Sequence, residues 1–165
     1  MKKLFPISLM IVATIMFLSP LASADSVMIN ASDFVCGEDH VAGVDFYCGW
    51  YLHNNIGATY RDFFAPVHLP EGAQITSLIV FYEDNSPSYI NVRMARNNMY
   101  TNTVQTMAEW NSTGQVNGWR TYKMYPVNYR GISNSGFGYV LYLHFGSSDD
   151  ELKIRGVRVI YTPAI

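Results

Sequence analysis

Apolar and polar residues alternate with a period of two in several stretches of the chain, and the clearest stretch runs from Phe137 to Phe145. Its odd-numbered residues are all aromatic or aliphatic, while its even-numbered residues include Tyr142 and His144. Successive side chains of a β-strand point to opposite faces, so strict alternation is typical of a strand with one buried face. The stretch therefore predicts a strand whose odd-numbered side chains lie in a core.

Two further segments predict strands of the same kind. The segment from Tyr89 to Arg96 has apolar side chains at Ile90, Val92 and Met94, and it would turn Ala95 outward together with Asn91 and Arg93. The segment from Tyr100 to Trp110 would place most of its even-numbered residues on one side.

The last apolar segment changes phase in its middle. Leu152 and Ile154 are even-numbered, whereas Val157 and Val159 are odd-numbered. A one-residue bulge at Gly156 would restore the alternation, and glycine is well suited to that position. The bulge would also keep three basic residues on the solvent side, where we expect them to pair with cross-strand carboxylates: Lys153, Arg155 and Arg158.

Turn-forming residues separate these segments at short, regular intervals, as at Pro70-Glu71-Gly72 and at Asp84-Asn85-Ser86-Pro87. No long segment shows the 3.6-residue period of an amphipathic helix. About eight to ten short strands with this spacing predict an all-β fold, an antiparallel β-sandwich of the jelly-roll or immunoglobulin-like type. A closed β-barrel is the alternative architecture.

Residues 1–24 have the composition of a secretory signal peptide. Two lysines precede an apolar run, and the segment closes with Ala22-Ser23-Ala24, which predicts cleavage before Asp25. Residues 25–165 would then form a single secreted or periplasmic domain of a bacterial protein. No later apolar stretch approaches the ~20 residues of a membrane-spanning helix.

Both cysteines of the chain, Cys36 and Cys48, lie after this segment. An even number of cysteines in an exported protein predicts a disulfide, and the intervening segment contains glycines that allow it to double back. Such a bridge would stabilise the fold by about 3 kcal/mol. A redox pair or half of a metal site is the alternative.

Composition and motifs argue against several function classes. The formal net charge is −2, whereas nucleic-acid binders usually carry a basic surface. The sequence has no nucleophile elbow, no zinc-protease motif and no phosphate-binding glycine loop, and its four histidines are scattered. We therefore expect no enzymatic activity, no cofactor and no nucleic-acid partner.

Acidic residues gather at Glu83-Asp84-Asn85 and at Asp149-Asp150-Glu151. Oxygen ligands at strand ends could hold calcium, which makes Asp84 and Asn85 the candidates for a metal site. Neither cluster has the ligand spacing of a known calcium loop, and Asp and Asn start turns by bonding their own backbone. We interpret both clusters as turns.

Tyrosine is unusually abundant, and all 12 tyrosines lie after residue 24. An exposed tyrosine ring can stack on the C–H face of a sugar, while arginine, asparagine and histidine bond the hydroxyls. Tyr89 and Arg93 on one predicted outward face, and Tyr142 and His144 on another, have this character. Ordinary cross-strand aromatic pairing is the alternative interpretation of each residue.

One stretch resembles a recurring pattern. Residues 64–73 read Phe-Ala-Pro-Val-His-Leu-Pro-Glu-Gly-Ala, residues 82–85 read Tyr-Glu-Asp-Asn, and residues 157–162 read Val-Arg-Val-Ile-Tyr-Thr. The Ala-Pro-x-x-Leu-Pro-x-Gly-Ala and Tyr-x-Asp-Asn patterns are similar to those of small exported bacterial β-sandwich proteins to which no activity is assigned. The resemblance implies the fold and the export, and it carries over no catalytic residue.

These observations together predict a non-enzymatic binding or surface-interaction module, with a glycan as the most plausible partner. The alternative is a structural subunit of an envelope or extracellular assembly that self-associates through its edge strands. A hydrolase would require a nucleophile, a base and an orienting group to converge in one pocket.

Overall fold

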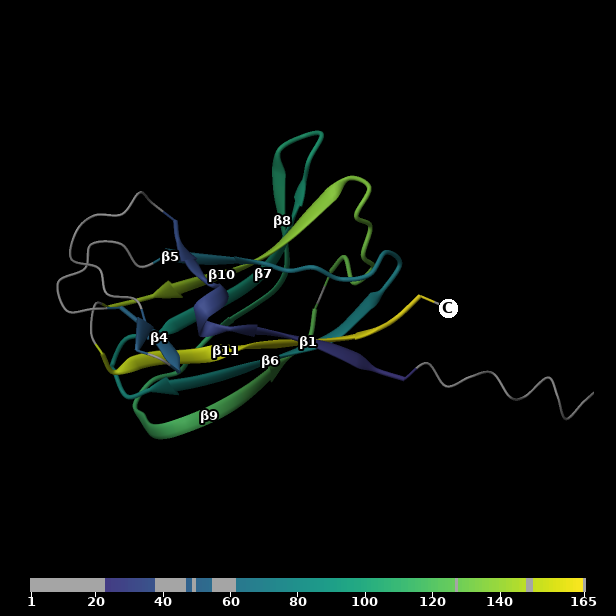
Figure 1. The fold of residues 1–165 in the computed structure, drawn as a ribbon. Coiled ribbons are helices and arrows are strands. Elements are labelled where there is room, and N and C mark those ends of the chain that lie inside the picture. Colours follow the sequence, from purple (N-terminus) through teal and green to yellow (C-terminus); the bar gives the residue numbers. More distant parts are fainter. Residues whose placement is uncertain are drawn as a thin grey trace, which may run out of the picture.

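The computed structural model describes residues 23–37, 47–48, 50–54, 62–126, 128–147 and 150–164, and these form two antiparallel β-sheets packed face to face (Figure 1). The predicted antiparallel sandwich is confirmed, and the described strands do not close into a barrel. The described residues form eleven strands where about eight to ten were expected, because three of these strands have only two or three residues.

The first sheet has six strands, and its long central strands are β6 and β11. β1 and β4 both pair with β11, beside different parts of its length, and β9 forms the opposite edge. Its members are β1 (Asp25–Asn30), β3 (Tyr47–Cys48), β4 (Tyr51–His53), β6 (Gln74–Asp84), β9 (Val116–Met124) and β11 (Leu152–Thr162).

The second sheet has five strands in the order β2-β5-β10-β7-β8. A short 3₁₀ helix, η1 (Ala31–Asp33), leads from β1 of the first sheet into β2 of the second. The five strands are β2 (Val35–Cys36), β5 (Asp62–Pro66), β7 (Ile90–Asn98), β8 (Thr103–Asn111) and β10 (Phe137–Phe145).

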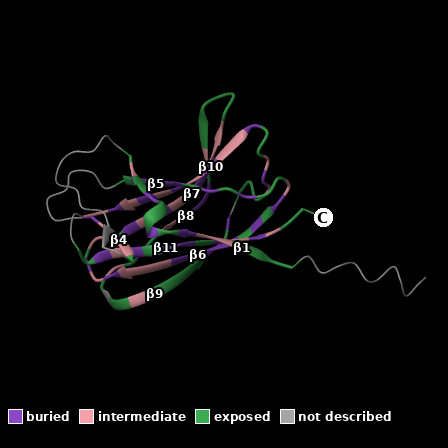
Figure 2. Cartoon of the chain, viewed as in Figure 1, coloured by how far each residue is buried: buried purple, intermediate pink, exposed green. Residues whose placement is uncertain are grey.

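Alternate residues along the strands of both sheets are buried and form a common core between the sheets. Figure 2 colours the buried residues of these strands purple. In β10 the odd-numbered residues from Tyr139 to Phe145 are buried, and Tyr142 and His144 lie on the outer face, as the alternation predicted. Burying one such leucine or phenylalanine contributes roughly 1.5–3 kcal/mol. The inner faces thus stabilise the fold, which leaves the outer faces for other roles.

The predicted bulge at Gly156 is confirmed. The register between β11 and β6 shifts between Ile154 and Gly156, whose φ is 153°. A Cβ on this residue would overlap the carbonyl oxygen of Ile29, so only glycine fits here. Because of the bulge, Arg155 and Arg158 are both exposed on the outer face of the six-stranded sheet.

The strand predicted from Tyr100 to Trp110 starts only at Thr103. Tyr100 lies in the preceding turn, where the side-chain oxygen of Asn98 accepts its backbone N–H at 2.9 Å. Asn102 takes a φ of 51° in the same turn. Local side-chain bonding of this kind competes with strand pairing, so the prediction was wrong at this end.

The alternation predicted for this region is also interrupted. A register shift between β7 and β8 at Met94 and Ala95 leaves Met107 and Ala108 both buried in succession. Ala95, which was expected to face solvent, is fully buried beside this irregularity. A β-bulge breaks the period of two, so the pattern fails at this point.

The predicted signal segment, residues 1–24, lies almost wholly outside the described ranges and stays a prediction. Within those ranges, no helix has the length and apolarity needed to cross a bilayer. Cys36 has a free thiol and is half-buried, and the side chain of Cys48 is outside the described part of the chain. The predicted Cys36–Cys48 disulfide therefore also stays a prediction.

Candidate functional site

The outer face of the five-stranded sheet carries all four residues that the sequence suggested for ligand binding. Arg93 of β7 pairs directly with Tyr142 of β10, and His144 follows on the same side of β10. Tyr89 precedes β7, and its ring centroid lies 5.9 Å from that of His144. We term the outward side of β2, β5, β7, β8 and β10 the five-strand face.

One row of side chains crosses this face at right angles to the strands. The register places the row in the order Glu109, Arg93, Tyr142, Phe64 and Val35, one residue from each strand. Directly opposed residues of antiparallel strands point to the same side and are close enough to interact. The row therefore changes from charged at the β8 edge to aromatic in the centre and apolar at β2.

Tyr142 is held from two sides in the middle of this row. The ring of Phe64 meets it edge-on, with centroids 4.9 Å apart, and the guanidinium carbon of Arg93 lies 4.5 Å from its centroid. In the described structure the side chain of Arg93 makes no hydrogen bond and no ion pair, and its Nε is buried without a partner. The tyrosine ring thus orients a guanidinium whose terminal N–H groups are still available as donors.

A second, polar row runs beside the first. The Nδ1 atom of His144 lies 2.7 Å from a carboxylate oxygen of Asp62, its cross-strand neighbour. On the other side of β10, the side-chain amide of Asn91 donates to Glu109 at 2.9 Å and to Asn111 at 2.7 Å. This network fixes the side chains before any ligand arrives.

A hollow of about 410 Å³ lies over the same face. Val35 and Met99 line it and are 63% and 69% exposed, while Gly138 leaves room in its floor. The Oδ1 atom of Asn97, which also lines the hollow, is buried without a hydrogen-bond partner. The hollow combines apolar walls with an unused polar atom, which is the usual composition of a small-molecule site.

Charge is nearly balanced on the five-strand face. Arg93 is its cation, and Asp62 and Glu109 are its acidic groups, as the direct cross-strand neighbours of His144 and Arg93. Such a surface has little net potential with which to attract an ion. Its geometry suits a neutral ligand rich in hydroxyl groups.

The basic stripe on β11 differs from what the sequence predicted. Lys153 pairs with Glu83 at 3.9 Å, as expected. Arg155 and Arg158 have no carboxylate partner among the described residues, and each guanidinium instead lies over an aromatic ring. The expectation of carboxylate pairing was therefore wrong for two of the three residues.

Asp84, the candidate for a metal ligand, uses both carboxylate oxygens within the fold. One accepts the backbone N–H of Ser86 at 3.3 Å, and the other accepts that of Gly114 at 3.0 Å. Asn85 donates its backbone N–H to the carbonyl of Glu151 at 3.1 Å. No metal-ligand group of three or more His, Cys, Asp or Glu occurs within the described ranges. These contacts fit the interpretation of the cluster as a turn.

Aromatic residues also close the open side of the sandwich between β8 and β9. Trp110 stacks on Tyr122 with centroids 4.6 Å apart, and Tyr82 meets Trp110 edge-on at 4.8 Å. Burial raises the pKa of Tyr82 above its usual value, and the carboxylate of Asp84 raises it further. This cluster covers the core at that edge, so the ring of Trp110 packs against other rings and is not open to a ligand.

The sequence did not reveal Phe64 and Asn97. Phe63 and Phe64 are adjacent and identical, so the pattern could not show that Phe63 faces the core and Phe64 faces outward. The parity of β5 becomes clear only from its pairing with Tyr142 and Leu143. Asn97 is the penultimate residue of β7, and nothing in the local sequence shows that its side chain faces the hollow.

No protein-family model and no curated protein matches the sequence. Among solved structures, a family 35 carbohydrate-binding module from Clostridium thermocellum is similar at 20% identity and a TM-score of 0.47, over 82% of this chain and 97% of that one. A family 35 module from an environmental isolate is similar at 15% identity and a TM-score of 0.44, over 84% and 98%.

A third similar structure holds the CBM22-1 and GH10 modules of the endo-1,4-β-D-xylanase 10B of Clostridium thermocellum, complexed with xylohexaose. The identity is 10% and the TM-score 0.47, over 87% of this chain and 28% of that chain. This chain thus spans little more than a quarter of that one. At TM-scores below 0.5, none of these similarities supports a ligand or an activity for this protein.

Proposed function

We propose that this protein is a non-enzymatic glycan-binding module and that its ligand lies across the five-strand face. The observation that carries the proposal is the convergence of Tyr89, Arg93, Tyr142 and His144, from two strands and a loop, on one exposed surface. Their rings and their polar groups lie side by side, which is the combination that a sugar needs.

The chemistry of a neutral sugar matches this surface. Tyr89 is 41% exposed, and its ring offers a face to sugar C–H groups. The terminal N–H groups of Arg93 donate to sugar hydroxyls, and the Asp62 carboxylate beside His144 accepts from them. Each neutral hydrogen bond contributes about 0.5–1.5 kcal/mol, so a shallow site with a few bonds binds with millimolar to micromolar affinity.

Export to the periplasm or the medium is part of the proposal. β1 begins at Asp25, the first residue after the predicted cleavage site, and pairs along β11 as far as Asn30. The resemblance to small exported bacterial β-sandwich proteins supports the same location. A Cys36–Cys48 disulfide belongs to this proposal, and non-reducing mass spectrometry of the exported protein tests it.

Binding to immobilised neutral polysaccharides and to a glycan array tests the proposal. The unmodified protein is expected to bind at least one neutral glycan, and Tyr89→Ala and Tyr142→Ala are expected to lose that binding. Tyr100→Ala is the matched control, because Tyr100 is 82% exposed in the turn before β8 and lies off the face. Thermal unfolding checks that each variant is folded.

Two outcomes would contradict the proposal. One is the absence of binding to every glycan tested. The other is a folded Tyr142→Ala variant that binds as tightly as the unmodified protein. Light scattering addresses the alternative of a self-associating structural subunit, since a monomer at all concentrations argues against assembly.

A further inference from the structure

Three basic residues on β11 each lie over an aromatic ring on the outer face of the six-stranded sheet. Lys153 Nζ is 5.5 Å from the ring centroid of Tyr51, Arg155 Cζ is 3.9 Å from that of Trp119, and Arg158 Cζ is 5.5 Å from that of Phe81. The rings come from β4, β9 and β6, on both sides of β11. We term these six side chains the six-strand face.

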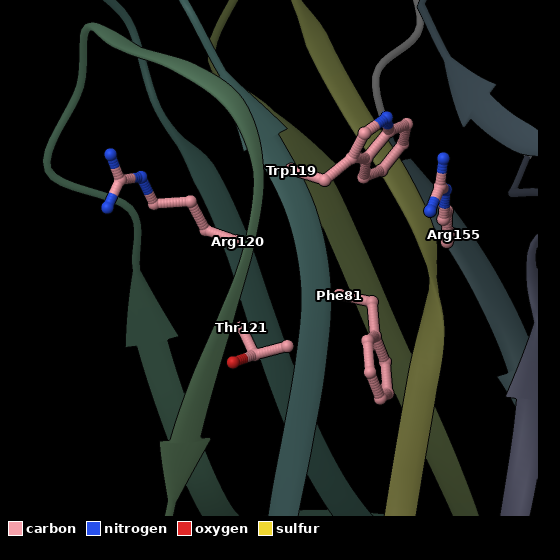
Figure 3. Close-up of a pocket in the computed structure, with 5 residues that line it drawn as sticks. All are labelled: Phe81, Trp119, Arg120, Thr121 and Arg155. Carbon is pink, nitrogen blue, oxygen red and sulfur yellow. The ribbon is translucent and has the colours of Figure 1, made fainter.

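A hollow of about 470 Å³ lies within this face and is lined by Phe81, Trp119, Arg120, Thr121 and Arg155. Figure 3 shows the guanidinium of Arg155 beside the indole of Trp119, with Phe81 and Thr121 nearby. The side chain of Arg120 points to the opposite side. Phe81, Trp119, Thr121 and Arg155 thus bring two rings, a hydroxyl and a guanidinium to the hollow.

The charge of this face is not balanced. Glu83 pairs with Lys153, and neither Arg155 nor Arg158 has a carboxylate partner in the described parts of the chain. Both arginines are exposed, on a chain whose formal net charge is −2. Two cations on one face of an acidic protein indicate an anionic ligand.

The shape of the cationic groups narrows the class of anionic ligand further. A guanidinium stacked on an indole keeps its N–H groups in one plane, and this fork matches a carboxylate through two parallel hydrogen bonds. Phe81 supplies an apolar surface for C–H groups, and the exposed Thr121 hydroxyl can donate to or accept from another hydroxyl. A carboxylate, a C–H face and hydroxyls occur together in an acidic sugar unit.

We propose that the six-strand face binds an acidic polysaccharide, with a sugar carboxylate on Arg155 and a second carboxylate of the same chain at Arg158. The bulge sets two residues of β11 opposite one of β6, so the two arginines are two pairing positions apart, which corresponds to roughly 7 Å along the strand. They can therefore address different sugar units. This site is separate from the five-strand face and does not depend on the function proposed there.

Isothermal titration of the full chain with polygalacturonate, a polymer of carboxylate-bearing sugars, tests this proposal. The unmodified protein is expected to bind it, and binding is expected to weaken as salt concentration rises. Arg155→Ala and Arg158→Ala are each expected to lose about tenfold or more in affinity, because each removes a charge-assisted contact. Arg130→Ala removes the same charge from an exposed residue in the loop between β9 and β10, outside this hollow, and it is expected to bind as the unmodified protein does.

Further probes test whether the protein recognises the carboxylated sugar or only its negative charge. Arg155→Lys keeps the charge and loses the planar fork, so it is expected to bind more weakly than the unmodified protein. Poly-glutamate and dextran sulfate present anions without a carboxylated sugar and are expected to bind more weakly than polygalacturonate. Thermal unfolding confirms that each variant is folded, and unchanged binding of Arg155→Ala to a neutral glycan keeps the two sites distinguishable.

The proposal is overturned by any of four results. These are no binding of polygalacturonate, equal or tighter binding of poly-glutamate or dextran sulfate, full affinity in the folded Arg155→Ala and Arg158→Ala variants, and equal losses in Arg130→Ala and Arg155→Ala.

Discussion

The two outer faces of the sandwich use the same contact and differ in charge. On each face a guanidinium lies over an aromatic ring, Arg93 over Tyr142 on one and Arg155 over Trp119 on the other. On the five-strand face, carboxylates are direct neighbours of the basic groups, whereas Arg155 and Arg158 have none among the described residues.

This difference shows how one fold can present two kinds of surface. The inner side chains of both sheets are apolar and interchangeable in role, because they only have to fill a common core. The outer side chains have no such requirement, so the charge of the two faces can differ. Balanced charge with free donors favours a neutral sugar, and unpaired arginines favour an acidic one.

The largest effect is expected from a substitution in the core that both sheets share. Phe145 is fully buried, and its ring meets Phe63 edge-on with centroids 5.6 Å apart. Phe145→Ala is expected to lower the free energy of unfolding by about 3–5 kcal/mol, measured by urea denaturation. Val35→Ala changes an exposed residue and is expected to stay within about 0.5 kcal/mol. A loss below about 1 kcal/mol in Phe145→Ala would show that the core is packed differently.

The next largest effect is expected from a substitution that mainly alters the six-strand face. Gly156→Ala adds a Cβ where the carbonyl oxygen of Ile29 lies, and is expected to destabilise the fold by about 1–3 kcal/mol. Polygalacturonate binding is expected to fall more than neutral glycan binding, since the bulge aligns Arg155 with Arg158. Gly118→Ala is the control, because Gly118 has a φ of 89° but an added Cβ meets nothing within 4 Å. Equal destabilisation by both variants would contradict the role of the close contact.

A smaller effect is expected when the charge of the five-strand face is made more like that of the six-strand face. Asp62→Asn with Glu109→Gln removes both acidic groups of the five-strand face and leaves Arg93 without a neighbouring carboxylate. The double variant is expected to gain affinity for polygalacturonate by a few-fold, since an exposed charge contributes about 0.2–1 kcal/mol. The same titration measures it, with Asp33→Asn, exposed in η1, as a control. Unchanged affinity would mean that charge balance does not distinguish the faces.

The smallest effect concerns alkaline pH and the six-stranded sheet. Burial raises the pKa of Tyr161 above the ordinary value of 10.0, and the hydrogen bond that its hydroxyl donates to Asp25 raises it further; burial also raises the pKa of Tyr82. The folded state therefore favours the protonated tyrosines. Their stabilisation is complete below about pH 10 and is lost as pH rises through the folded-state pKa.

Urea denaturation from pH 9 upward measures this loss as a falling free energy of unfolding. Tyr161→Phe and Tyr82→Phe are expected to flatten the fall, because phenylalanine does not titrate. Tyr100→Phe, in the turn before β8, is the matched control and is expected to leave the fall unchanged. An equally steep fall in all three variants would contradict the assignment.

The sequence predicted the strands best where one face is buried and no bulge intervenes. β10 has the predicted bounds and faces, and the single glycine in β11 located its bulge, because the alternation changes phase at a residue type that favours bulges. β8 was predicted poorly for two reasons. No glycine marks its bulge, and the turn before it has a residue pattern that resembles the start of a strand. Bulges depend on pairing between strands, which a single sequence does not contain.

The two candidate sites also differ in how much of each could be predicted from the sequence. Tyr89, Arg93, Tyr142 and His144 could be named from parity, and their convergence required the register of β7 against β10. The six-strand face was missed, although its arginines and Trp119 were visible in the sequence. Its rings come from three strands separated by long stretches of chain, so only the sheet order brings them to β11.

Nuclear magnetic resonance titration of the isotope-labelled protein tests most directly whether the two faces bind different sugars. Neutral hexasaccharides of glucose, xylose and mannose and a short oligogalacturonate are added separately. We expect amide shifts confined to β5, β7 and β10 with a neutral sugar, and to β6, β9 and β11 with the acidic one. Shifts on the same face for both ligands, or on neither face, would contradict the presence of two distinct sugar-binding faces.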